Sequence, residues 1–412
     1  MTTLHPTTHD VRLVRDEELR AAYDLFGAAL LHGPVNDERW ERAAGLYAPQ
    51  RTIGVFDGSG LFGTAMSFPV EVVVPGGAAL PTAAVTRVGV RADRTRRGVL
   101  TALMRRQLDE AAAAGDVLAS LRATEARIYG RFGYGVATRG RTVRIKRNGG
   151  SGWRSGAPAG GDVRMLTADE MVPALGAVHE RVGLARPGGM TRTRPWWDLG
   201  LGGLLQERTL VLAAVHTGAD GEDGYLVATV DDSGGWHDRV LVLRDLHATT
   251  VEAATALWRF ALDVDLVAAV EARLRPLDEP LELLLADPRD CATTAVEDET
   301  WLRIVDVPAA LAARRFAAAE PVLIAVHDAV RAANGGVYRI ADGGAERVGE
   351  LGGAQTPDLE CDVAGLAMAY LGDRAPSELA ATGWWRAWSP AATARADAAF
   401  GTDRLPWCGT NF

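Results

Sequence analysis

A basic, glycine-containing segment between a predicted strand and a predicted helix is the part of the sequence best suited to chemistry. The apolar run Ala83–Val90 leads into Arg96, Arg97 and Gly98, after which apolar residues recur at helical spacing. The first backbone N–H groups of a helix lack internal partners and the helix dipole is positive there, so a diphosphate is held favourably. The pattern predicts an anion-binding loop. A solvated basic turn that caps a helix is the alternative.

Two neighbouring segments extend this signal. Backbone groups at Val88 and Val90, just before the loop, could bind an amide-bearing chain such as pantetheine. After the next buried strand, residues 123–135 read Ala-Thr-Glu-Ala-Arg-Ile-Tyr-Gly-Arg-Phe-Gly-Tyr-Gly. This second block is long and specific in its order of residues.

The two blocks together closely resemble the Eis (enhanced intracellular survival) family of GNAT N-acetyltransferases. The segment at 96–100, Arg-Arg-Gly-Val-Leu, and the block at 123–135 recur in that family in this order. The loop fits the general GNAT diphosphate pattern only in part, because Thr95 stands at its first position and Leu100 replaces a small residue. Residues 301–311, Trp-Leu-Arg-Ile-Val-Asp-Val-Pro-Ala-Ala-Leu, and the aromatic C-terminus also look like this family.

The resemblance implies acetyl-CoA as co-substrate and no metal. The residues expected to bind it are Val88, Gly89, Val90, Arg96, Arg97, Gly98, Val99, Leu100, Thr101, Thr124 and Glu125.

The family's general acid corresponds to Tyr129. Acyl transfer to an amine releases a thiolate, and a thiol has a pKa of about 8.5. A donor with a somewhat higher pKa suits its reprotonation, and the ordinary tyrosine pKa of about 10 meets that need. Without the resemblance, a helix aromatic packed on the sheet is the simpler interpretation of Tyr129. Tyr134 is a rival, although its flanking glycines indicate a turn.

The family's general base is the terminal carboxylate, which the final residue Phe412 carries here. An α-carboxyl has a pKa of about 3.3–3.7, so it is ionised at neutral pH and can accept a proton or hold an ammonium group. A frayed tail is the alternative, although Leu405–Cys408 is apolar enough to dock. Asn411 stands where some members of the family have an acidic residue, which puts a preference for aminoglycosides in doubt.

Acidic residues for the acceptor pocket are instead sought in a loop-like segment after the first predicted helix. Asp37, Glu38 and Glu41 lie there, close to Trp40. A solvated helix start explains these carboxylates equally well.

The elements that position these residues follow an α+β order. Residues 11–14, 52–56, 61–74, 83–90, 117–121 and 138–145 are predicted strands, and 17–31, 98–115 and 125–132 are predicted helices. The Gly/Ser-rich stretch 148–161 predicts an exposed connection. The resemblance implies tandem GNAT domains, each a mixed sheet with helices on both faces, and then a sterol-carrier-like α+β domain. The expected domains are 1–147 with the acetyl-CoA site, 148–307 without a cofactor loop, and 308–412 ending in the active site.

The amino-acid composition excludes some classes of binding partner and indicates the cellular environment. A net charge of −9 and a pI near 5.5 argue against nucleic acid or an anionic membrane as the main partner. No apolar run reaches the roughly 20 residues of a membrane helix, and Met1–Asp10 has no secretory apolar region. Three unpaired cysteines favour a reducing cytoplasm, and the eight histidines show no metal spacing. The resemblance implies a homo-hexamer.

The leading hypothesis is therefore an acetyl-CoA-dependent N-acetyltransferase that acts on primary amines of cationic polyamine small molecules such as aminoglycosides. Lysine or peptide N-acetylation is the runner-up. A non-catalytic CoA sensor and a lipid-binding carrier are the alternatives from other functional classes.

Overall fold

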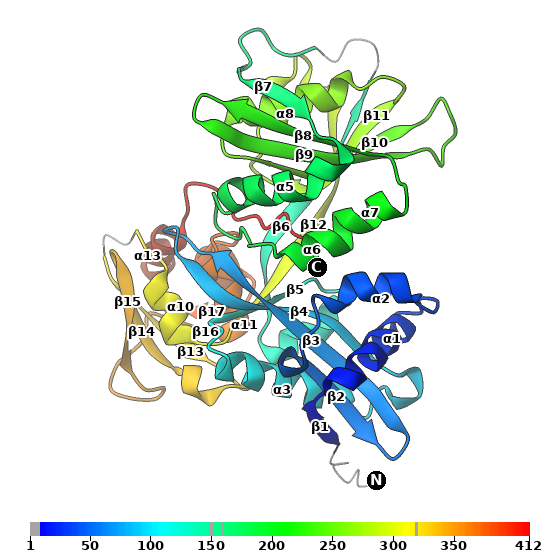
Figure 1. Cartoon of the computed structure of the whole chain (residues 1–412). Coiled ribbons are helices and arrows are strands. Elements are labelled where there is room, and N and C mark those ends of the chain that lie inside the picture. Colours follow the sequence, from blue (N-terminus) through cyan, green and yellow to red (C-terminus); the bar gives the residue numbers. More distant parts are fainter. Residues whose placement is uncertain (1–8, 148–151, 159, 318–319) are drawn as a thin grey trace.

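Two β-sheets organise the chain. The computed structural model describes residues 9–147, 152–158, 160–317 and 320–412. A twelve-stranded sheet has the order β1-β2-β3-β4-β5-β12-β6-β11-β10-β9-β8-β7, and a five-stranded sheet has the order β15-β14-β13-β16-β17. The larger sheet carries a first unit and a central unit, and the smaller one carries a C-terminal unit (Figure 1).

The first unit contains half of the larger sheet, with helices on both faces. Its strands are β1 (Asp10–Leu13), β2 (Thr52–Asp57), β3 (Gly60–Val73), β4 (Ala79–Val90), β5 (Leu118–Leu121) and β6 (Gly135–Lys146). Its helices are α1 (Leu19–Ala29), α2 (Asp37–Ala44), α3 (Val99–Ala113) and α4 (Ala126–Tyr129), with 3₁₀ turns η1 (Asp16–Glu18), η2 (Pro49–Arg51), η3 (Ala92–Arg94) and η4 (Gly130–Phe132). Helix α3 buries Val99 and Leu103 against Ile53 and Val55 of β2, which fixes the start of α3 beside the sheet.

Helix α2 corrects the expectation of a loop-like segment after the first helix. The Asn36 side chain accepts a hydrogen bond from the backbone N–H of Arg39 at 3.0 Å, as a helix N-cap does. Ala43, a residue of this helix, is fully buried. The segment therefore forms two turns of helix that begin at Asp37.

The central unit repeats the arrangement of strands covered by helices. Its strands are β7 (Asp162–Met165), β8 (Val211–Gly218), β9 (Gly221–Asp231), β10 (Val240–Ala248), β11 (Ala269–Pro276) and β12 (Cys291–Ile304). Its helices are α5 (Ala168–Val182), α6 (Arg194–Trp197), α7 (Gly203–Gln206), α8 (Val251–Asp263) and α9 (Leu281–Leu284), with a π-helical turn η5 (Asp198–Gly202) and a 3₁₀ turn η6 (Pro288–Asp290). The predicted connection 148–161 lies outside the described residues at 148–151 and 159.

Strands β6 and β12 join the first and central units into one sheet. They pair with each other over most of their length. The far end of β6, residues 140–146, pairs with β11 of the central unit. The far end of β12, Trp301–Ile304, pairs with β5 of the first unit. Each strand thus begins in one unit and ends in the other, so the sheet has no break at 147. The boundaries expected at 147 and 307 stay predictions.

The C-terminal unit packs against this shared pair of strands. Its strands are β13 (Val322–His327), β14 (Gly336–Ala341), β15 (Gly344–Gly349), β16 (Leu359–Asp362) and β17 (Trp385–Ala387). Its helices are α10 (Val307–Ala313), α11 (Val363–Tyr370), α12 (Pro376–Ala381) and α13 (Pro390–Phe400), with a 3₁₀ turn η7 (Ala332–Asn334). Helix α11 reaches β6 where Gly135 leaves room: a Cβ there would lie 2.3 Å from the carbonyl oxygen of Ala364.

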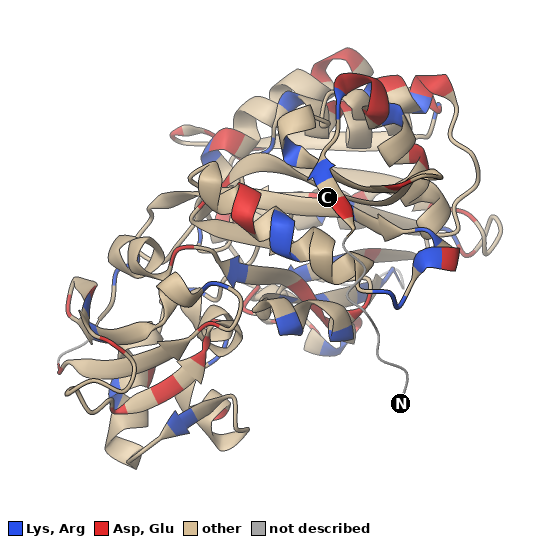
Figure 2. Cartoon of the chain, turned by 90° about the horizontal axis from the view of Figure 1, so that it is seen from below, with Lys and Arg blue, Asp and Glu red and all other residues tan. Residues whose placement is uncertain are grey.

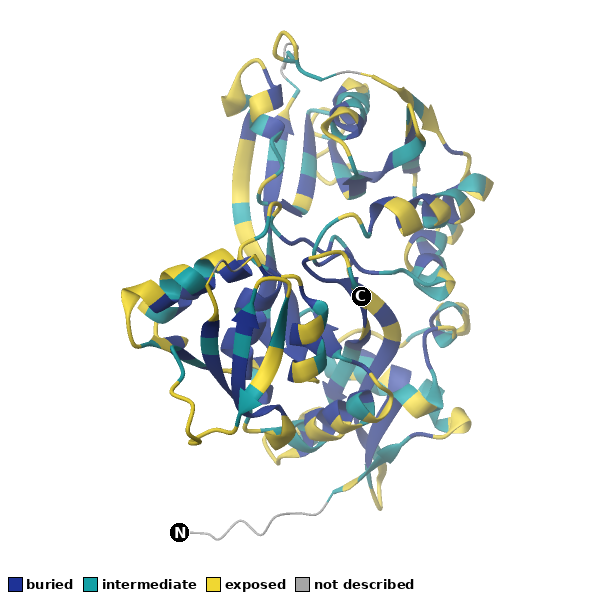
Figure 3. Ribbon diagram, turned by 90° about the vertical axis from the view of Figure 1, so that its left-hand side faces the viewer, coloured by how far each residue is buried: buried dark blue, intermediate teal, exposed yellow. Residues whose placement is uncertain are grey.

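The last residues cross back from the C-terminal unit. Residues 401–412 form neither helix nor strand, and they run between the first and central units, where the C-terminus lies (Figures 1 and 3). Among the residues that the structure describes, no helix is long and apolar enough to cross a membrane.

Candidate active site

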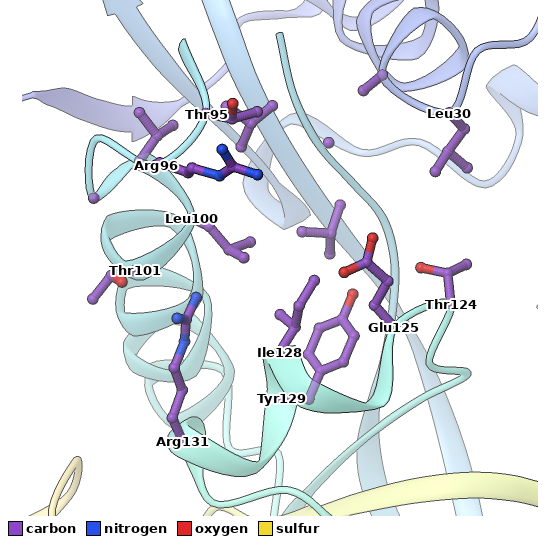
Figure 4. A pocket seen from close by; sticks show the side chains of 16 residues that line it. Leu30, Thr95, Arg96, Leu100, Thr101, Thr124, Glu125, Ile128, Tyr129 and Arg131 are labelled. Atoms are coloured by element: carbon purple, nitrogen blue, oxygen red, sulfur yellow. The ribbon is translucent and has the colours of Figure 1, made fainter. Parts of the chain in front are cut away.

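A cavity of about 690 Å³ lies between the end of β4, the start of α3 and the short helix α4 (Figure 4). Its lining includes most of the residues that the sequence predicts to bind the cofactor: Val88, Gly89, Val90, Arg96, Gly98, Val99, Leu100, Thr101, Thr124 and Glu125. Tyr129 lines it as well, whereas Arg97 does not. The lining also includes residues that the sequence did not single out: Ala29, Leu30, Thr95, Ile128 and Arg131.

The cavity opens because β4 and β5 diverge. These parallel strands pair only between Thr82–Ala84 and Leu118–Ser120, while β4 continues to Val90. A bulge sets Arg87 and Val88 opposite a single residue of β3, and Arg87 has a φ of 52°. A bulge bends its strand and leaves backbone groups unpaired. On the side of β5, the backbone beyond the bulge is therefore free to bind an amide-bearing chain.

The start of α3 supplies an anion site at one end of this cavity. Gly98 adopts a φ of 82°, and among the described residues no side chain caps the helix. The first helical hydrogen bond runs from the N–H of Ala102 to the carbonyl of Gly98 at 3.0 Å. The N–H groups of residues 99–101 therefore have no carbonyl of the helix to donate to. A Cβ at Gly98 would meet no atom within 4 Å, so the space in front of these N–H groups is open.

The arginines of the loop are not equivalent. Arg96 lines the cavity, whereas Arg94 pairs with Asp57 at 2.9 Å. The carbonyl of Arg97 accepts a hydrogen bond from the His9 ring at 3.0 Å. Free backbone donors, the Arg96 guanidinium of the loop and an open backbone edge match the parts of a diphosphate joined to a pantetheine arm. The donor set therefore fits coenzyme A.

Helix α1 closes the cavity on the side opposite α4. A Cβ at Gly89 would lie 3.0 Å from the Cβ of Ala29 and 3.3 Å from the Cα of Phe26. Glycine at 89 therefore allows α1 to cross β4 at short distance. This crossing brings Ala29 and Leu30 to the lining.

Tyr129 ends α4, and its hydroxyl points into the cavity (Figure 4). The side chain is buried, its ring meets that of Tyr134 edge-on at 6.0 Å, and none of the described residues accepts a hydrogen bond from its hydroxyl. Burial, with a smaller effect of the Glu125 charge, raises the pKa of Tyr129 above its ordinary value. The phenol is therefore protonated at neutral pH and free to donate into the cavity.

Tyr134 is placed differently from Tyr129. It is almost completely buried, it does not line the cavity, and its hydroxyl lies 3.5 Å from Oε1 of Gln107. Its position suits packing between α3 and the sheet.

The C-terminal tail is anchored by Glu299, a fully buried carboxylate on β12. The backbone N–H groups of Cys408 and Gly409 donate to its two oxygens at 3.0 and 2.8 Å. The hydroxyl of Thr138 and the guanidinium of Arg122 also donate to it, at 2.9 and 3.2 Å. One carboxylate thus links the tail to β6 and to the end of β5.

A buried arginine of the central unit holds the next residues of the tail. Arg192 donates to the carbonyl of Gly409 at 2.8 Å and to the hydroxyl of Thr410 at 3.0 Å, and it pairs with Asp245. Burial alone would raise the pKa of Asp245, but the charge of Arg192 and the contacts with His247 hold this pKa below the ordinary range. The tail is fixed from both units and does not fray.

Phe412 lies at the end of this anchored segment. Its ring packs edge-on against Phe68 of β3 at 5.8 Å, and the Nε1–H of Trp196 donates to the carbonyl of Asn411 at 2.8 Å. No described side chain forms an ion pair with the terminal carboxylate. Phe412 does not belong to the lining of the cofactor cavity, so the structure places the two predicted catalytic residues in separate surroundings.

The acidic residues proposed for an acceptor pocket lie at the exposed start of α2. Asp37 pairs with Arg20 at 2.8 Å and its side chain is 87% exposed. Glu38 lines a shallow groove with Asn36 and Gln206. Their surroundings are those of a solvated helix start.

The central unit has a different connection at the corresponding position. There β10 pairs in parallel with β11, as β4 does with β5, but only Thr249 and Thr250 join β10 to α8. The Thr250 side chain accepts from the N–H of Ala253 at 3.1 Å and so caps the helix start itself. In the first unit that start is left open.

Comparisons with protein families divide the chain into three matches. Residues 10–137 and 188–304 match two models of the acetyltransferase (GNAT) domain. Residues 307–409 match the sterol carrier protein domain.

Individual relatives match along almost the whole chain. An N-acetyltransferase of Streptomyces avermitilis, described as uncharacterised, is 37% identical over 98% of this chain and 100% of its own. The N-acetyltransferase Eis of Mycobacterium tuberculosis is 33% identical over 85% of each chain. The crystal structure of Eis1 from Mycobacterium abscessus has a TM-score of 0.87 at 38% identity, covering 98% of this chain and 100% of that one. A GCN5-related N-acetyltransferase from Anabaena variabilis, at 19% identity and a TM-score of 0.82, has the same fold over 98% of this chain and 100% of its own.

Proposed function

Since the chain belongs to the Eis family of GNAT N-acetyltransferases, we propose that it transfers the acetyl group of acetyl-CoA to a primary amine of a small molecule. It is an acyltransferase with tandem GNAT domains and a sterol-carrier-like domain, and GNAT acetyltransferases use acetyl-CoA. Polyamines such as aminoglycosides are the acceptors that the resemblance suggests, and lysine side chains of peptides are the runner-up.

The cavity of the first unit supports the binding half of this proposal. The N–H groups of residues 99–101 and Arg96 bind the diphosphate, and the backbone at Val88–Val90 aligns the pantetheine arm. Thr124 and Glu125 border the arm from the other side of the cavity. When bound, acetyl-CoA supplies an activated acyl group whose transfer forms a C–N bond as the C–S bond breaks.

Tyr129 serves as the general acid in this proposal. Its buried hydroxyl faces the cavity, is not engaged by other described residues, and has a raised pKa. It therefore holds a proton at neutral pH and gives it to the departing sulfur.

The carboxylate of Phe412 serves as the general base. It takes a proton from the acceptor's ammonium group, so that a neutral amine is available to react. The anchoring by Glu299 and Arg192 supports this role, because a base must be held in place to act at a defined atom.

The observation that carries the proposal is the Tyr129 hydroxyl in a cavity that ends at the uncapped start of α3. A lipid carrier is less well supported, because α11 and α13 fill the inner face of the smaller sheet with fully buried side chains such as Leu366 and Ala396. A CoA sensor without catalysis would need no acid at Tyr129. Membership in a homo-hexamer and a cytoplasmic location follow from the resemblance and from composition, and they remain proposals.

Thiol release from acetyl-CoA tests the function directly. Wild type, Tyr129→Phe and a chain lengthened by three glycines after Phe412 are compared with hexylamine, spermidine, an aminoglycoside and a lysine peptide. The same three glycines placed at the N-terminus serve as control. Amine-dependent release by wild type that is lost in the first two variants supports the scheme. Full activity of the lengthened chain rules out the terminal base, and binding of acetyl-CoA without release favours the sensor.

A further inference from the structure

A second cavity, of about 370 Å³, lies on the other side of α1 and of the β4 bulge from the cofactor cavity. Phe26 and Gly27 of α1 line it, whereas Ala29 and Leu30 line the cofactor cavity. In the same way Arg87 lines it, and the next residue, Val88, lines the cofactor cavity. The two cavities are therefore neighbours, separated by α1 and by β4 at the point where β4 leaves β5.

The same cavity borders the segment that holds the end of the tail. Leu199 and Gly200 of η5 are part of its lining. Three residues before Leu199, Trp196 donates to the carbonyl of Asn411. Leu199 therefore lies about one helical turn from the residue that holds Asn411. The cavity thus borders both the elements that line the cofactor cavity and the segment that holds the tail, a position that suits an acceptor amine.

The charge of the lining is positive. Arg39, Arg42 and Arg87 contribute guanidinium groups, and His32 lies beside them. Glu207 is the carboxylate in this lining, and it already lies 3.6 Å from Arg42. Both signs of charge are spread along the ribbon of the whole molecule, so the net charge of −9 does not set the charge of this cavity (Figure 2).

Two of these guanidinium groups have no anionic partner among the residues that the structure describes. Neither Arg39 nor Arg87 forms an ion pair. The Arg87 guanidinium lies 5.3 Å above the ring of Tyr47, which in turn packs on Tyr23 and Trp40. The ring of Tyr47 holds the Arg87 guanidinium in the lining, where no carboxylate of the described residues pairs with it. Arginine favours carboxylate and phosphate groups, and it repels a second ammonium.

We propose that the acceptor is an amine that also carries an anionic group, a carboxylate or a phosphate, and that Arg87 and Arg39 bind this group in the second cavity. The proposal rests on the proposed function. The amine end then points toward Tyr129 and the tail. This acceptor class differs from polycations such as aminoglycosides, because Asp37, Glu38 and Glu41 lie outside this lining.

Matched acceptors of one chain length test the inference. The rates of 6-aminohexanoate, hexylamine and 1,6-diaminohexane are compared at saturating acetyl-CoA, and glucosamine 6-phosphate is compared with glucosamine. We expect kcat/KM for 6-aminohexanoate to exceed that for the other two amines by about tenfold or more, the gain of one charge-assisted contact. A larger gain in the sugar pair identifies phosphate as the preferred anion, and a larger gain in the aliphatic set identifies carboxylate.

Variants then assign the preference to these arginines. In Arg87→Met and in the exposed Arg39→Met, the advantage of the anionic acceptor falls, while KM for acetyl-CoA and the melting temperature stay unchanged. Arg87→Glu shifts the preference to the diamine. Arg105→Met, at an exposed position of α3 outside both linings, is the control and retains the preference.

Equal kcat/KM for the three aliphatic amines overturns the inference and leaves the proposed function intact. A preference for the anionic acceptor that survives both Arg87→Met and Arg39→Met also overturns it. No thiol release with any amine refutes the proposed function and this inference with it.

Discussion

The Tyr129 side chain is buried, and its hydroxyl has no hydrogen-bond partner among the described residues, so its effect on stability can be separated from its proposed role in catalysis. Since the hydroxyl has no partner among the described residues, Tyr129→Phe removes no intramolecular hydrogen bond. We expect kcat to fall by about 10²–10⁴-fold, the range for loss of a general acid, with KM for acetyl-CoA within about twofold. Stopped-flow thiol release and thermal unfolding measure both effects. Tyr134→Phe is the matched control, and a comparable loss of kcat in that variant would contradict the assignment.

The raised pKa of Tyr129 also makes a prediction about pH. A general acid must be protonated, so kcat falls as the pH rises through its pKa. Burial raises this pKa above the ordinary value of about 10, so the alkaline fall of kcat is expected only above pH 10. Steady-state rates between pH 7 and 11, corrected for uncatalysed hydrolysis, check this expectation. An alkaline fall that persists unchanged in Tyr129→Phe belongs to another group.

The sequence predicted the lining residues of the cavity better where they are contiguous than where they come from distant parts of the chain. Val88–Val90 and Arg96–Thr101 line the cavity because one strand, one loop and one helix start carry them in succession. Arg97 shares the loop but does not line the cavity; the chain turns sharply there, since Arg96 and Gly98 on either side of it have positive φ values of 60° and 82°. Leu30 and Arg131 reach the cavity through packing of α1 and η4, for which no local pattern gave a signal.

Among the elements, the open start of α3 is the one that holds the cofactor in the proposed function. Gly98 and Gly115 flank this helix with nearly the same φ, 82° and 81°, and neither has an atom within 4 Å of a Cβ. Alanine at either position is therefore strained to a similar degree, by roughly 1 kcal/mol. Only Gly98→Ala places a methyl group in front of the phosphate donors. We expect it to raise KM for acetyl-CoA by about tenfold or more, a change of about 1.4 kcal/mol, and Gly115→Ala to leave KM unchanged. Titration calorimetry with coenzyme A checks the difference, and equal effects of the two variants would refute it.

Strand β12 offers a matched pair of carboxylates for testing the tail. Glu299 accepts two backbone N–H groups of the tail, whereas Glu297 is exposed and lies 3.7 Å from Arg273. Glu299→Gln turns one acceptor into a donor that faces N–H groups, so the tail loses its anchor. We expect kcat to fall at least about tenfold, equivalent to 1.4 kcal/mol, with acetyl-CoA binding retained and Glu297→Gln unaffected. Faster digestion by carboxypeptidase in Glu299→Gln is the readout of tail release. Unchanged digestion together with unchanged kcat argues against the anchor.

Elements with strong local patterns were predicted, and those set by tertiary pairing were not. The strands around β4, the helix after Gly98 and the block around Tyr129 occur where the periodicity placed them. Helix α2 was missed because its apolar face is short, although Asn36 is a recognisable cap. The apolar segment that begins at Trp301 is the end of the longer β12, whose first half, exposed and polar around Thr293 and Glu297, shows no apolar alternation.

For the whole molecule, buried histidines beneath the tail couple stability to pH. His179 and His247 are almost fully buried, and burial lowers the pKa of both below the ordinary value. The unfolded chain, with histidine pKa values near 6.5, therefore binds more protons below that pH. Stability is fully present above pH 6.5 and decreases as the pH falls below it.

Thermal unfolding at pH 7.5 and 5.5 measures this coupling. We expect the melting temperature to fall by several degrees between the two values, with a smaller fall in His247→Gln. His237→Gln, at an exposed turn, serves as control. A melting temperature that rises on acidification would contradict the sign of the prediction.

Strands β6 and β12 each begin in one unit and end in the other, and this arrangement has a consequence during synthesis on the ribosome. Strand β5 emerges long before its neighbour, since the Trp301–Ile304 segment of β12 lies about 180 residues further along the chain. At about 5–20 residues per second, this interval lasts roughly 10–35 s. Throughout it, the first unit presents an open strand edge at β5, which is a surface prone to wrong pairing. We therefore expect chaperones to bind the nascent first unit until translation has passed residue 304.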